Sequence, residues 1–385
     1  MSDPQTNTNA MTDELYRLAF SMAPGMHVNA AERILGAVGD ARAYFELPAQ
    51  ELKNLTGLDD KFVSKEFRHG LLAKAADELK FIKRGGVGCR FMRDGDYPAR
   101  MLQCEDGPAM LYTLGNCDLN AQHTVAIVGT RRCTPYGQSV AKKIVETLAA
   151  KVPADDGGVV IVSGLAYGID IAAHRAALEC GLRTVGVVAH PLNKLYPPEH
   201  RQYAVEMINK GGALVSEYPT AVADQLKSFA FLERNRIIAG LSDICIVVES
   251  DYRGGAMSTA RHAQYYNRDV YAVPGRVSDR YSAGCNQLIL TNRAQIIVDI
   301  ERFVDSLGWG AGCQQKKERQ MHMAFALDDR QRRVVDLIKA NPDYTVNDVV
   351  RACGLSYSDV TEILFSLEMG GVVTALPGGR FSINF

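Results

Sequence analysis

The sequence has no surplus of charge of either sign, because 43 lysines and arginines stand against 44 aspartates and glutamates. This balance excludes a global positive field that would attract a polyanion, so any nucleic-acid surface has to come from local clusters of cations. No apolar run approaches the ~18 residues of a transmembrane helix, and the N-terminus lacks the cationic and apolar segments of a signal peptide. We therefore expect a cytoplasmic protein with no membrane insertion.

The sequence also lacks the usual signatures of a metal site. Its nine cysteines form no C-x-x-C pair and no cluster with histidine at the spacing of zinc ligands. His190 and His200 are predicted to be polar loop residues, because no cysteine or acidic partner lies at ligand spacing from them. No single turn carries a cluster of carboxylates, which argues against a metal nuclease. We expect free thiols in a reducing compartment and no cofactor.

The pattern of apolar residues changes along the 385 residues, which indicates more than one domain. Apolar residues at helical spacing run from Leu15 to about Phe81. From Thr124 onward, short and fully apolar strands alternate with helices, as in a doubly wound, mostly parallel sheet that is buried on both faces. The predicted domains of this α/β chain are a helical SAM-like or helix-hairpin-helix-like domain over 1–85, a Rossmann-like core over 86–306, a polar linker over 307–325, and a winged helix-turn-helix with a Pro-Gly-Gly hairpin over 326–385.

In an open α/β sheet, ligands bind where the carboxyl ends of strands meet the following helices, so the residues after each strand matter most. The first such turn begins at Gly129 and lacks the G-x-G-x-x-G pattern of a dinucleotide site. It offers instead Thr130, Arg131 and Arg132, together with free backbone amides near a helix N-terminus. Hydroxyl and guanidinium donors suit a phosphate diester that stays outside the turn. The alternative is that the two arginines form a solvated surface pair.

The second turn, SGLAYGID, contains Ser163, Gly164 and Gly168. Glycines on both sides of the bend permit positive φ angles and a close approach of a ligand to backbone N–H groups, which together form an anion nest. Ser163 adds a hydroxyl group to this nest. Asp170 is interpreted as a carboxylate in the first helical turn, where the helix dipole favours it.

Two further turns offer similar groups. The third, HPLNKLYPPEHR, places Lys194 beside Tyr196, which gives a point charge for a phosphate and an aromatic face for a base. The fifth turn, over 253–260, begins with Arg253, Gly254 and Gly255, and it again offers hydroxyl groups and a helix N-terminus. Several turns of this kind at the carboxyl edge of one sheet favour a shared binding site.

The fourth segment is helical and carries Arg234, Asn235 and Arg236. Arg236 lies three residues after Glu233 and therefore shares a helix face with it, whereas Arg234 points elsewhere. We expect one of the two arginines to be structural, paired with Glu233, while the other reaches the ligand.

Seven motifs in order resemble the signature of the DNA-processing protein A (DprA/Smf) family: VAIVGTRRCTPYG, SGLAYGIDIAAHRAAL, LYPPEHR, SEYP, FLERNRIIAGLS, GGAMSTARHA and VYAVPG. The resemblance covers about residues 91–300. It implies a non-enzymatic, homodimeric protein that binds and protects incoming single-stranded DNA. The family also loads the RecA recombinase onto that DNA during natural transformation (competence) and homologous DNA recombination, so RecA is an expected partner.

The resemblance also implies which residues hold the strand. Positions that match the family's strand-binding residues are Gly129, Thr130, Arg131, Ser163, Gly164, Gly168, Lys194, Asn235 and Arg236, with Arg132 as a weaker match. The chain departs from the family pattern at Phe231-Leu232-Glu233, where many members have Phe-Pro, and in the middle of the fifth turn.

An enzyme on a related Rossmann-like scaffold is the main alternative. Nucleotide phosphoribohydrolases carry P-G-G-x-G-T-x-x-E and use its final glutamate, but no carboxylate follows Gly254 and Gly255 at that position here. Glu217 and Glu249, near strand ends, are the only carboxylates considered as substitutes.

A transcription factor is the second alternative, with the helix over 356–368 in the major groove of duplex DNA. This helix contains Asp359, Glu362 and Glu368 but no lysine or arginine, which suits a phosphate-lined groove poorly. We therefore predict that the winged helix is a protein-contact or autoregulatory module. A weak contact of Arg380, in the wing, with DNA is the alternative.

Overall fold

The computed structural model describes residues 4–153, 158–222, 229–310, 328–341, 344–369, 372–376 and 380–383. The chain divides into two compact units, Met1–Trp309 and Gly310–Phe385. It is a mixed α/β protein with one large, mostly parallel sheet, which confirms the predicted fold class. Most of the predicted linker over 307–325, from residue 311 onward, lies outside the described residues.

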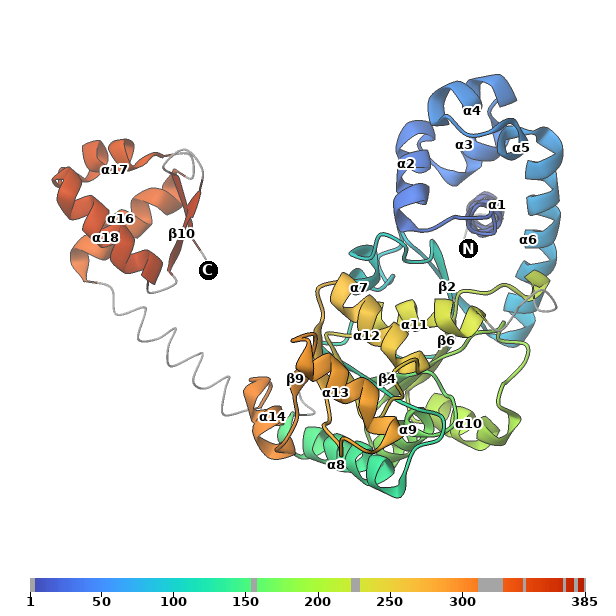
Figure 1. Cartoon of the computed structure of the whole chain (residues 1–385). Helices are drawn as coiled ribbons and strands as arrows, with labels where there is room; N and C mark the ends of the chain where they lie inside the picture. Colours follow the sequence, from blue (N-terminus) through green and yellow to red (C-terminus); the bar gives the residue numbers. More distant parts are fainter. Residues whose placement is uncertain are drawn as a thin grey trace. The chain divides into compact units, whose positions relative to one another are not determined.

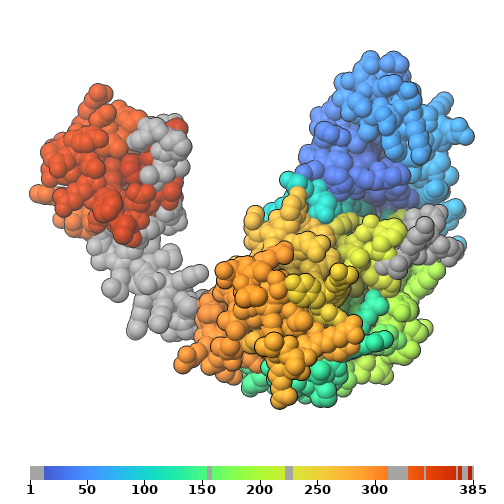
Figure 2. Space-filling model, viewed as in Figure 1, coloured from blue at the N-terminus to red at the C-terminus, as the bar shows by residue number. Residues whose placement is uncertain are grey.

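The first unit begins with helices whose buried residues, such as Leu18, Phe20 and Leu52, belong to the same apolar cluster as one face of the sheet. Gly57 ends one of these helices in the left-handed conformation, so this glycine is a helix cap. The helical segment packs directly on the rest of the unit, as the blue and adjoining surfaces of Figure 2 show. The helices are α1 (Pro4–Ser21), α2 (Val28–Val38), α3 (Ala41–Glu46), α4 (Ala49–Thr56), α5 (Asp60–Val63) and α6 (Lys65–Gly85). The domain boundary predicted at residue 85 stays a prediction.

One nine-stranded sheet forms the centre of this unit, in the order β1-β2-β6-β5-β4-β3-β7-β8-β9. The strands are β1 (Gly88–Phe91), β2 (Met110–Gly115), β3 (His123–Val128), β4 (Val159–Ser163), β5 (Thr184–Val187), β6 (Ala213–Ser216), β7 (Ile244–Val247), β8 (Asp269–Ala272) and β9 (Gln295–Ile296). The β1–β2 and β2–β6 pairs are antiparallel, and all other pairs of the sheet are parallel. From β3 the chain moves outward through β4, β5 and β6, then returns to the other side of β3 with β7. The topological switch point therefore lies between β3 and β7.

Helices cover both faces of the sheet, and the period-2 pattern of each strand decides which residues meet them. Val125 and Ile127 of β3 pack toward α8 and α9, whereas Ala126 and Val128 belong to the cluster that includes α11 and α12. All four are buried. The helices after the strands are α7 (Ala99–Leu102), α8 (Pro135–Lys151), α9 (Ile169–Glu179), α10 (Arg201–Asn209), α11 (Ala230–Gly240), α12 (Gly255–Tyr265), α13 (Ala283–Leu290) and α14 (Ile300–Ser306), several of which are labelled in Figure 1.

The second unit consists of three helices and a two-stranded antiparallel sheet, the arrangement of a winged helix. Thr345 caps the second helix, and the Ser356 hydroxyl accepts a hydrogen bond from the Asp359 N–H at the start of the third, so both predicted helix starts are confirmed. The predicted Pro-Gly-Gly turn, residues 377–379, lies outside the described residues. The elements are α16 (Asp329–Ala340), α17 (Val346–Cys353), α18 (Tyr357–Met369), β10 (Val373–Leu376) and β11 (Arg380–Ile383).

Within the described ranges, no helix combines the length and the apolar character needed to cross a bilayer. The cysteines of the same ranges are free thiols. No three histidine, cysteine, aspartate or glutamate side chains of these ranges gather in a way that would hold a metal ion.

A buried histidine makes the stability of the first unit sensitive to acid. His174 of α9 is fully buried, with its Nδ1 atom 2.7 Å from the Thr184 hydroxyl of β5. Burial, reinforced by the nearby charges of His200 and Arg234, lowers the pKa of His174 from 6.5 to about 3. The unfolded chain therefore binds a proton below pH 6.5 that the folded chain does not accept, so stability falls as the pH drops from 6.5 toward 3.

We expect His174 to remove about 2 kcal/mol of unfolding free energy between pH 6.5 and pH 5, at about 1.4 kcal/mol per pH unit. Urea unfolding of wild type and His174→Asn at both pH values measures this loss. The variant should be less stable at pH 7 but lose less on acidification, whereas His69→Gln, at an exposed histidine, should behave as wild type. An equal acid loss in wild type and His174→Asn would contradict the assignment.

Candidate nucleic-acid interface

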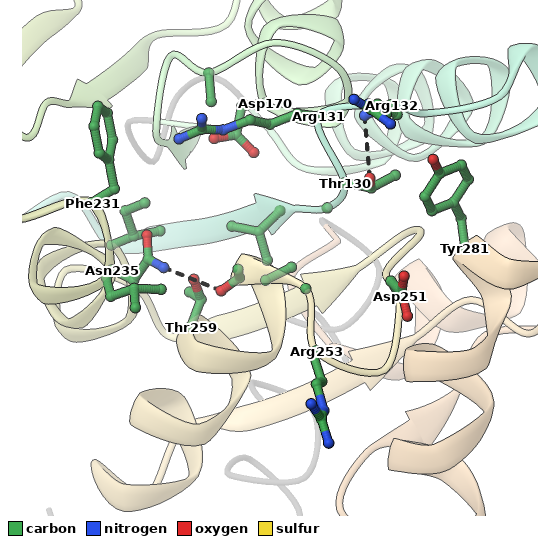
Figure 3. A pocket seen from close by; sticks show the side chains of 18 of the residues that line it. Thr130, Arg131, Arg132, Asp170, Phe231, Asn235, Asp251, Arg253, Thr259 and Tyr281 are labelled. Atoms are coloured by element: carbon green, nitrogen blue, oxygen red, sulfur yellow. Dashed lines mark hydrogen bonds between the residues drawn. The ribbon is translucent and has the colours of Figure 1, made fainter. Parts of the chain in front are cut away.

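A pocket of about 480 Å³ lies at the topological switch point, where β3, β4 and β7 end (Figure 3). We call it the arginine pocket. Its walls come from the turn after β3, the turn after β4, helix α11, the turn into α12 and the segment before α13. It is lined by Val128, Gly129, Thr130, Arg131, Arg132, Ala166, Asp170, Phe231, Leu232, Arg234, Asn235, Ile238, Asp251, Arg253, Gly254, Gly255, Ala256, Thr259, Arg280 and Tyr281.

The pocket is cationic although the whole chain is nearly neutral. Five arginines and two aspartates line it, which gives a formal charge of +3. Arg131 and Arg132 are exposed, and Figure 3 shows Arg131 beside Asp170 on one wall, with Asn235 and Thr259 on the opposite wall. Arg253 points away from the centre of the pocket in the same view. Because the whole chain carries almost no net charge, a polyanion site needs a local positive field, and this cluster of arginines provides one.

The first and second turns are packed backbone against backbone, and glycine makes this possible. Gly168 has a φ of +80° and directly precedes α9. A Cβ atom at this position would overlap the Thr130 carbonyl oxygen and the Arg131 backbone. The glycine predicted to open a nest for a ligand therefore also holds the first turn in place.

The amides at the start of α8 are not free, which corrects one expectation for the first turn. Glu249 follows β7 and is buried, and its carboxylate accepts hydrogen bonds from the Thr134 N–H at 2.8 Å and the Thr134 hydroxyl at 2.5 Å. The Thr134 hydroxyl in turn accepts from the Gly137 N–H at 3.1 Å. An internal carboxylate thus occupies the position at this helix N-terminus that an external phosphate would take. The turn contributes its side chains rather than these amides.

Ser163 and Gly164 do not line the arginine pocket, although Gly164 lines a smaller pocket that adjoins it. The Ser163 side chain is fully buried and its hydroxyl donates to the Ile127 carbonyl at 2.6 Å. The Gly164 N–H donates to Asp170 Oδ2 at 3.2 Å, and the Gly164 carbonyl accepts from Arg234 at 2.6 Å. The structure therefore gives these two residues internal partners.

Asp170 and Arg234 form the floor of the arginine pocket. Burial raises the pKa of Asp170, and the positive charge of Arg234 opposes this rise. Burial also lowers the pKa of Arg234 to about 10, while Asp170 acts in the opposite sense. Asp170 is thus more than the first-turn carboxylate that the sequence suggested, because it fixes the Gly164 backbone and faces a buried cation.

Arg236 points away from the pocket. Its guanidinium forms an ion pair with Glu217 and donates to the Asp106 carbonyl at 2.6 Å. Burial raises the pKa of Glu217, and Arg236 opposes this rise. Arg236 is thus a structural arginine, but its predicted partner is wrong, because Glu233 accepts from the Tyr218 hydroxyl instead. Arg234 is buried and donates to the Gly164 and Val187 carbonyls, and its contact with a ligand stays a prediction.

Asn235 and the two glycines of the fifth turn lie together in the pocket wall. Asn235 Nδ2 donates to the Gly255 carbonyl at 3.1 Å. Gly254 is the N-cap of α12, and the Met257 N–H donates to its carbonyl at 3.1 Å, so the amides of Gly255 and Ala256 are the first ones without a partner within the helix. These amides lie at the pocket wall, where Gly254, Gly255 and Ala256 line it. This helix N-terminus, unlike that of α8, has no side chain as its cap.

A smaller pocket continues the arginine pocket toward the third turn, with Arg131, Ala166, Phe231 and Arg234 lining both. We call it the tyrosine pocket, because Tyr167 and Tyr196 line it and are exposed. The Tyr196 ring lies edge-on to Phe231, with 5.8 Å between centroids, and the Arg131 guanidinium is 4.9 Å from the centre of the Phe231 ring. Lys194 is exposed and lines neither pocket.

Sequence reasoning named Arg253 in the fifth turn without counting it among the binding residues, and it missed Asp251 and Arg280. Asp251 directly precedes the fifth turn and was within reach of the strand-end argument. Arg280 follows β8 by eight positions, beyond the residues that directly follow the strand, so that argument did not extend to it.

Removing the Asp251 carboxylate should strengthen the binding of a polyanion here. Asp251 accepts from Arg280 at 2.5 Å in an exposed ion pair, and such pairs contribute little to stability. The Asp251→Asn variant frees Arg280 and removes a repulsive charge, so oligonucleotide affinity should rise roughly fivefold. Fluorescence anisotropy measures the change. The matched control is Asp305→Asn on α14, which breaks an exposed ion pair with Lys151 of α8. A rise in oligonucleotide affinity in both variants would exclude a local effect.

Comparisons with known proteins bear on both units. The family model described as DNA recombination-mediator protein A matches residues 89–308, and the DprA winged helix domain matches residues 320–379. The chain is 33% identical to a putative DNA processing protein DprA of Mycobacterium tuberculosis over 79% of each protein. It is 34% identical to Protein Smf of Escherichia coli over 74% of each. The X-ray structure of DprA from Streptococcus pneumoniae superposes with a TM-score of 0.60 at 29% identity, covering 75% of this chain and 95% of that one.

Proposed function

Because the chain belongs to the DNA recombination-mediator protein A (DprA/Smf) family, we propose that it binds single-stranded DNA along the arginine and tyrosine pockets and passes the strand to the RecA recombinase. One observation carries the DNA part of this proposal: arginines and exposed aromatic rings line connected pockets at the switch point of the sheet. Arginines can bind the phosphates of a single strand, and aromatic rings can stack with its unpaired bases.

Phosphate recognition rests on Arg131, Arg132 and the N-terminus of α12. The two arginines are exposed and present forked donors that suit a phosphate diester. The first amides of α12 add a partial positive charge on the opposite wall of the pocket. Phosphate contacts give affinity without reading sequence, so the binding should be sequence-tolerant and should weaken as salt rises.

Base contacts favour a single strand over a duplex. The tyrosine pocket has a volume of only about 10 Å³, which is too small for a base. The exposed faces of Tyr167 and Tyr196 at its rim are the surfaces on which unstacked bases lie. Base–aromatic stacking contributes ~1–3 kcal/mol per base, and a duplex hides the faces of its bases in its own stack.

The experiment that tests this proposal is a fluorescence-anisotropy titration of a labelled oligonucleotide, first single-stranded and then as a duplex, over a series of salt concentrations. The single strand should bind more tightly than the duplex. In a plot of the logarithm of its affinity against the logarithm of salt concentration, the slope should be ~−0.7 for each phosphate contacted. Equal affinity for duplex and single strand, or no salt dependence, would contradict it.

We propose that the chain acts by binding and not by catalysis. Glu217 pairs with Arg236, and Glu249 accepts two hydrogen bonds from Thr134, so both carboxylates considered for a hydrolase are engaged. In the phosphoribohydrolase alternative, Asp170 is the buried carboxylate of the arginine pocket that would act in catalysis. Release of adenine from AMP, lost in Asp170→Asn, would replace the binding proposal with that alternative.

The partner proposals follow from the family and from exposed surface. We propose a cytoplasmic homodimer that protects incoming DNA during natural transformation and loads RecA onto it. Leu290, the last residue of α13, and Val298, two residues after the edge strand β9, are each 77% exposed, and exposed apolar side chains near a sheet edge favour pairing with a second copy. Sedimentation of wild type and Leu290→Asp tests the dimer, since the variant should be monomeric.

The winged helix is proposed as a protein-contact module. Phe365 and Met369 are exposed on α18, on a helix whose charged residues are all acidic. An apolar and acidic face suits a protein partner better than a phosphate backbone.

A further inference from the structure

We propose that a second and larger pocket beside the arginine pocket holds an additional nucleotide of the same DNA strand. This side pocket has a volume of about 970 Å³ and lies between the start of α8 and the segment that follows β8. The inference rests on the proposed binding of single-stranded DNA and extends it to a subsite that the strand-end turns do not include.

The two pockets share a wall. Arg280 and Tyr281 line both the arginine pocket and the side pocket. Arg280 also lies over the Tyr281 ring, with 5.9 Å between the guanidinium carbon and the ring centre. A strand that leaves the arginine pocket at this wall passes a cation and an aromatic ring on its way into the side pocket.

The side pocket has the groups that a nucleotide needs. Tyr136, in the first turn of α8, is 57% exposed and gives a flat face for a base. Arg276 is exposed on the opposite loop and gives a charge for a phosphate, with the Ser278 hydroxyl beside it in the lining. Proteins that bind single strands without sequence preference generally combine an aromatic face with a cation in this way.

The side pocket carries no formal net charge, because Glu249 and Asp279 balance Arg276 and Arg280. Glu249 is held by hydrogen bonds from Thr134, and Arg280 also pairs with Asp251. The aromatic face of Tyr136 therefore has to supply most of the affinity of this subsite, with Arg276 as the cation for a phosphate. The volume lies at the upper end of the ~300–1,000 Å³ typical of small-molecule sites, so a base with its sugar has enough room.

The length of the oligonucleotide separates this subsite from the arginine pocket. The experiment measures the affinity of the full chain for oligothymidylates of about 4 to about 20 nucleotides, a range that brackets the ~4–16 nucleotides of single-strand sites. Wild type, Tyr136→Ala and Arg276→Ala are compared, with circular dichroism to confirm folding. The matched controls are Tyr265→Ala at the far end of α12 and Arg302→Ala on α14, both at exposed side chains outside the pockets.

We expect the two side-pocket variants to bind the shortest oligonucleotides as wild type does. For the longest oligonucleotides Tyr136→Ala should lose roughly 5- to 140-fold in affinity, the fold-change that corresponds to one base stack. Arg276→Ala should also lose affinity only for long strands, with a shallower salt dependence. The two control variants should match wild type at every length.

Three outcomes would overturn the inference. Unchanged affinity of both variants at all lengths would leave the side pocket without a ligand, and an equal loss at all lengths would place these residues in the arginine pocket instead. Tight binding of free thymidine monophosphate, lost in Tyr136→Ala, would assign the pocket to a free nucleotide rather than to the strand. Failure of wild type to bind any single strand would instead contradict the proposed function itself, and with it the premise of this subsite.

Discussion

Arg131→Glu should remove most of the affinity for single-stranded DNA without unfolding the protein. Arg131 is exposed and lines both the arginine and the tyrosine pockets, with its guanidinium over the Phe231 ring. Loss of a charge-assisted contact costs about 1.5–3 kcal/mol, and the new carboxylate adds repulsion of each nearby phosphate. We therefore expect at least a tenfold loss of affinity, and about 100-fold at low salt. Anisotropy titration measures it.

The matched control is Arg302→Glu, which makes the same charge reversal on α14. The Arg302 side chain is 89% exposed and lies in none of the described pockets. It should bind DNA as wild type does, apart from a small effect of net charge. If Arg131→Glu binds normally, or if both variants lose affinity equally, the strand does not lie along the arginine pocket.

Gly168→Ala should destabilise the first unit and disable the site at the same time. An alanine Cβ at this position meets the Thr130 carbonyl oxygen and the Arg131 backbone, and the φ of +80° is itself unfavourable for alanine. The first turn has to move away from α9, and Arg131 moves with it. We expect a loss of about 2–4 kcal/mol in unfolding free energy, together with at least tenfold weaker DNA binding.

Gly181→Ala is the control for the backbone conformation alone. Gly181 follows the other end of α9 with a φ of +73°, and a Cβ there meets nothing within 4 Å. This variant should lose only about 1 kcal/mol and should bind DNA normally. Urea unfolding and anisotropy measure both variants. Equal destabilisation by the two substitutions would show that the contact between the first and second turns does not hold the site together.

The sequence predicted the strands, the helices and the edge of the sheet at which the arginine pocket lies. Runs such as TVAIVG have to be buried strands, and helices between them favour parallel pairing. The order of the strands was not accessible, because every strand is equally apolar. Only the structure shows that β7 returns beside β3, which places the turn after Val128 opposite the Gly254-Gly255 turn.

The side chains of the site were harder to place than its turns. Ser163, Arg236 and Glu249 all stand at strand ends or on the expected helix, yet each has an internal partner. Residue type at a turn does not tell which way the side chain points, and the partner of Glu249 lies 115 positions away along the chain. Arg131 and Asn235 were placed correctly in the pocket wall because the turn and the helix that carry them both border the switch point.

The most direct test of the central claim is photo-cross-linking of an iodouracil-substituted single strand to the full-length chain, with the modified residues identified by mass spectrometry. A strand along the connected pockets should cross-link to aromatic residues there, above all Phe231 and Tyr196, and Arg131→Glu should abolish these cross-links. Cross-links confined to the winged helix or to the N-terminal helices, with none at the carboxyl edge of the sheet, would contradict the account.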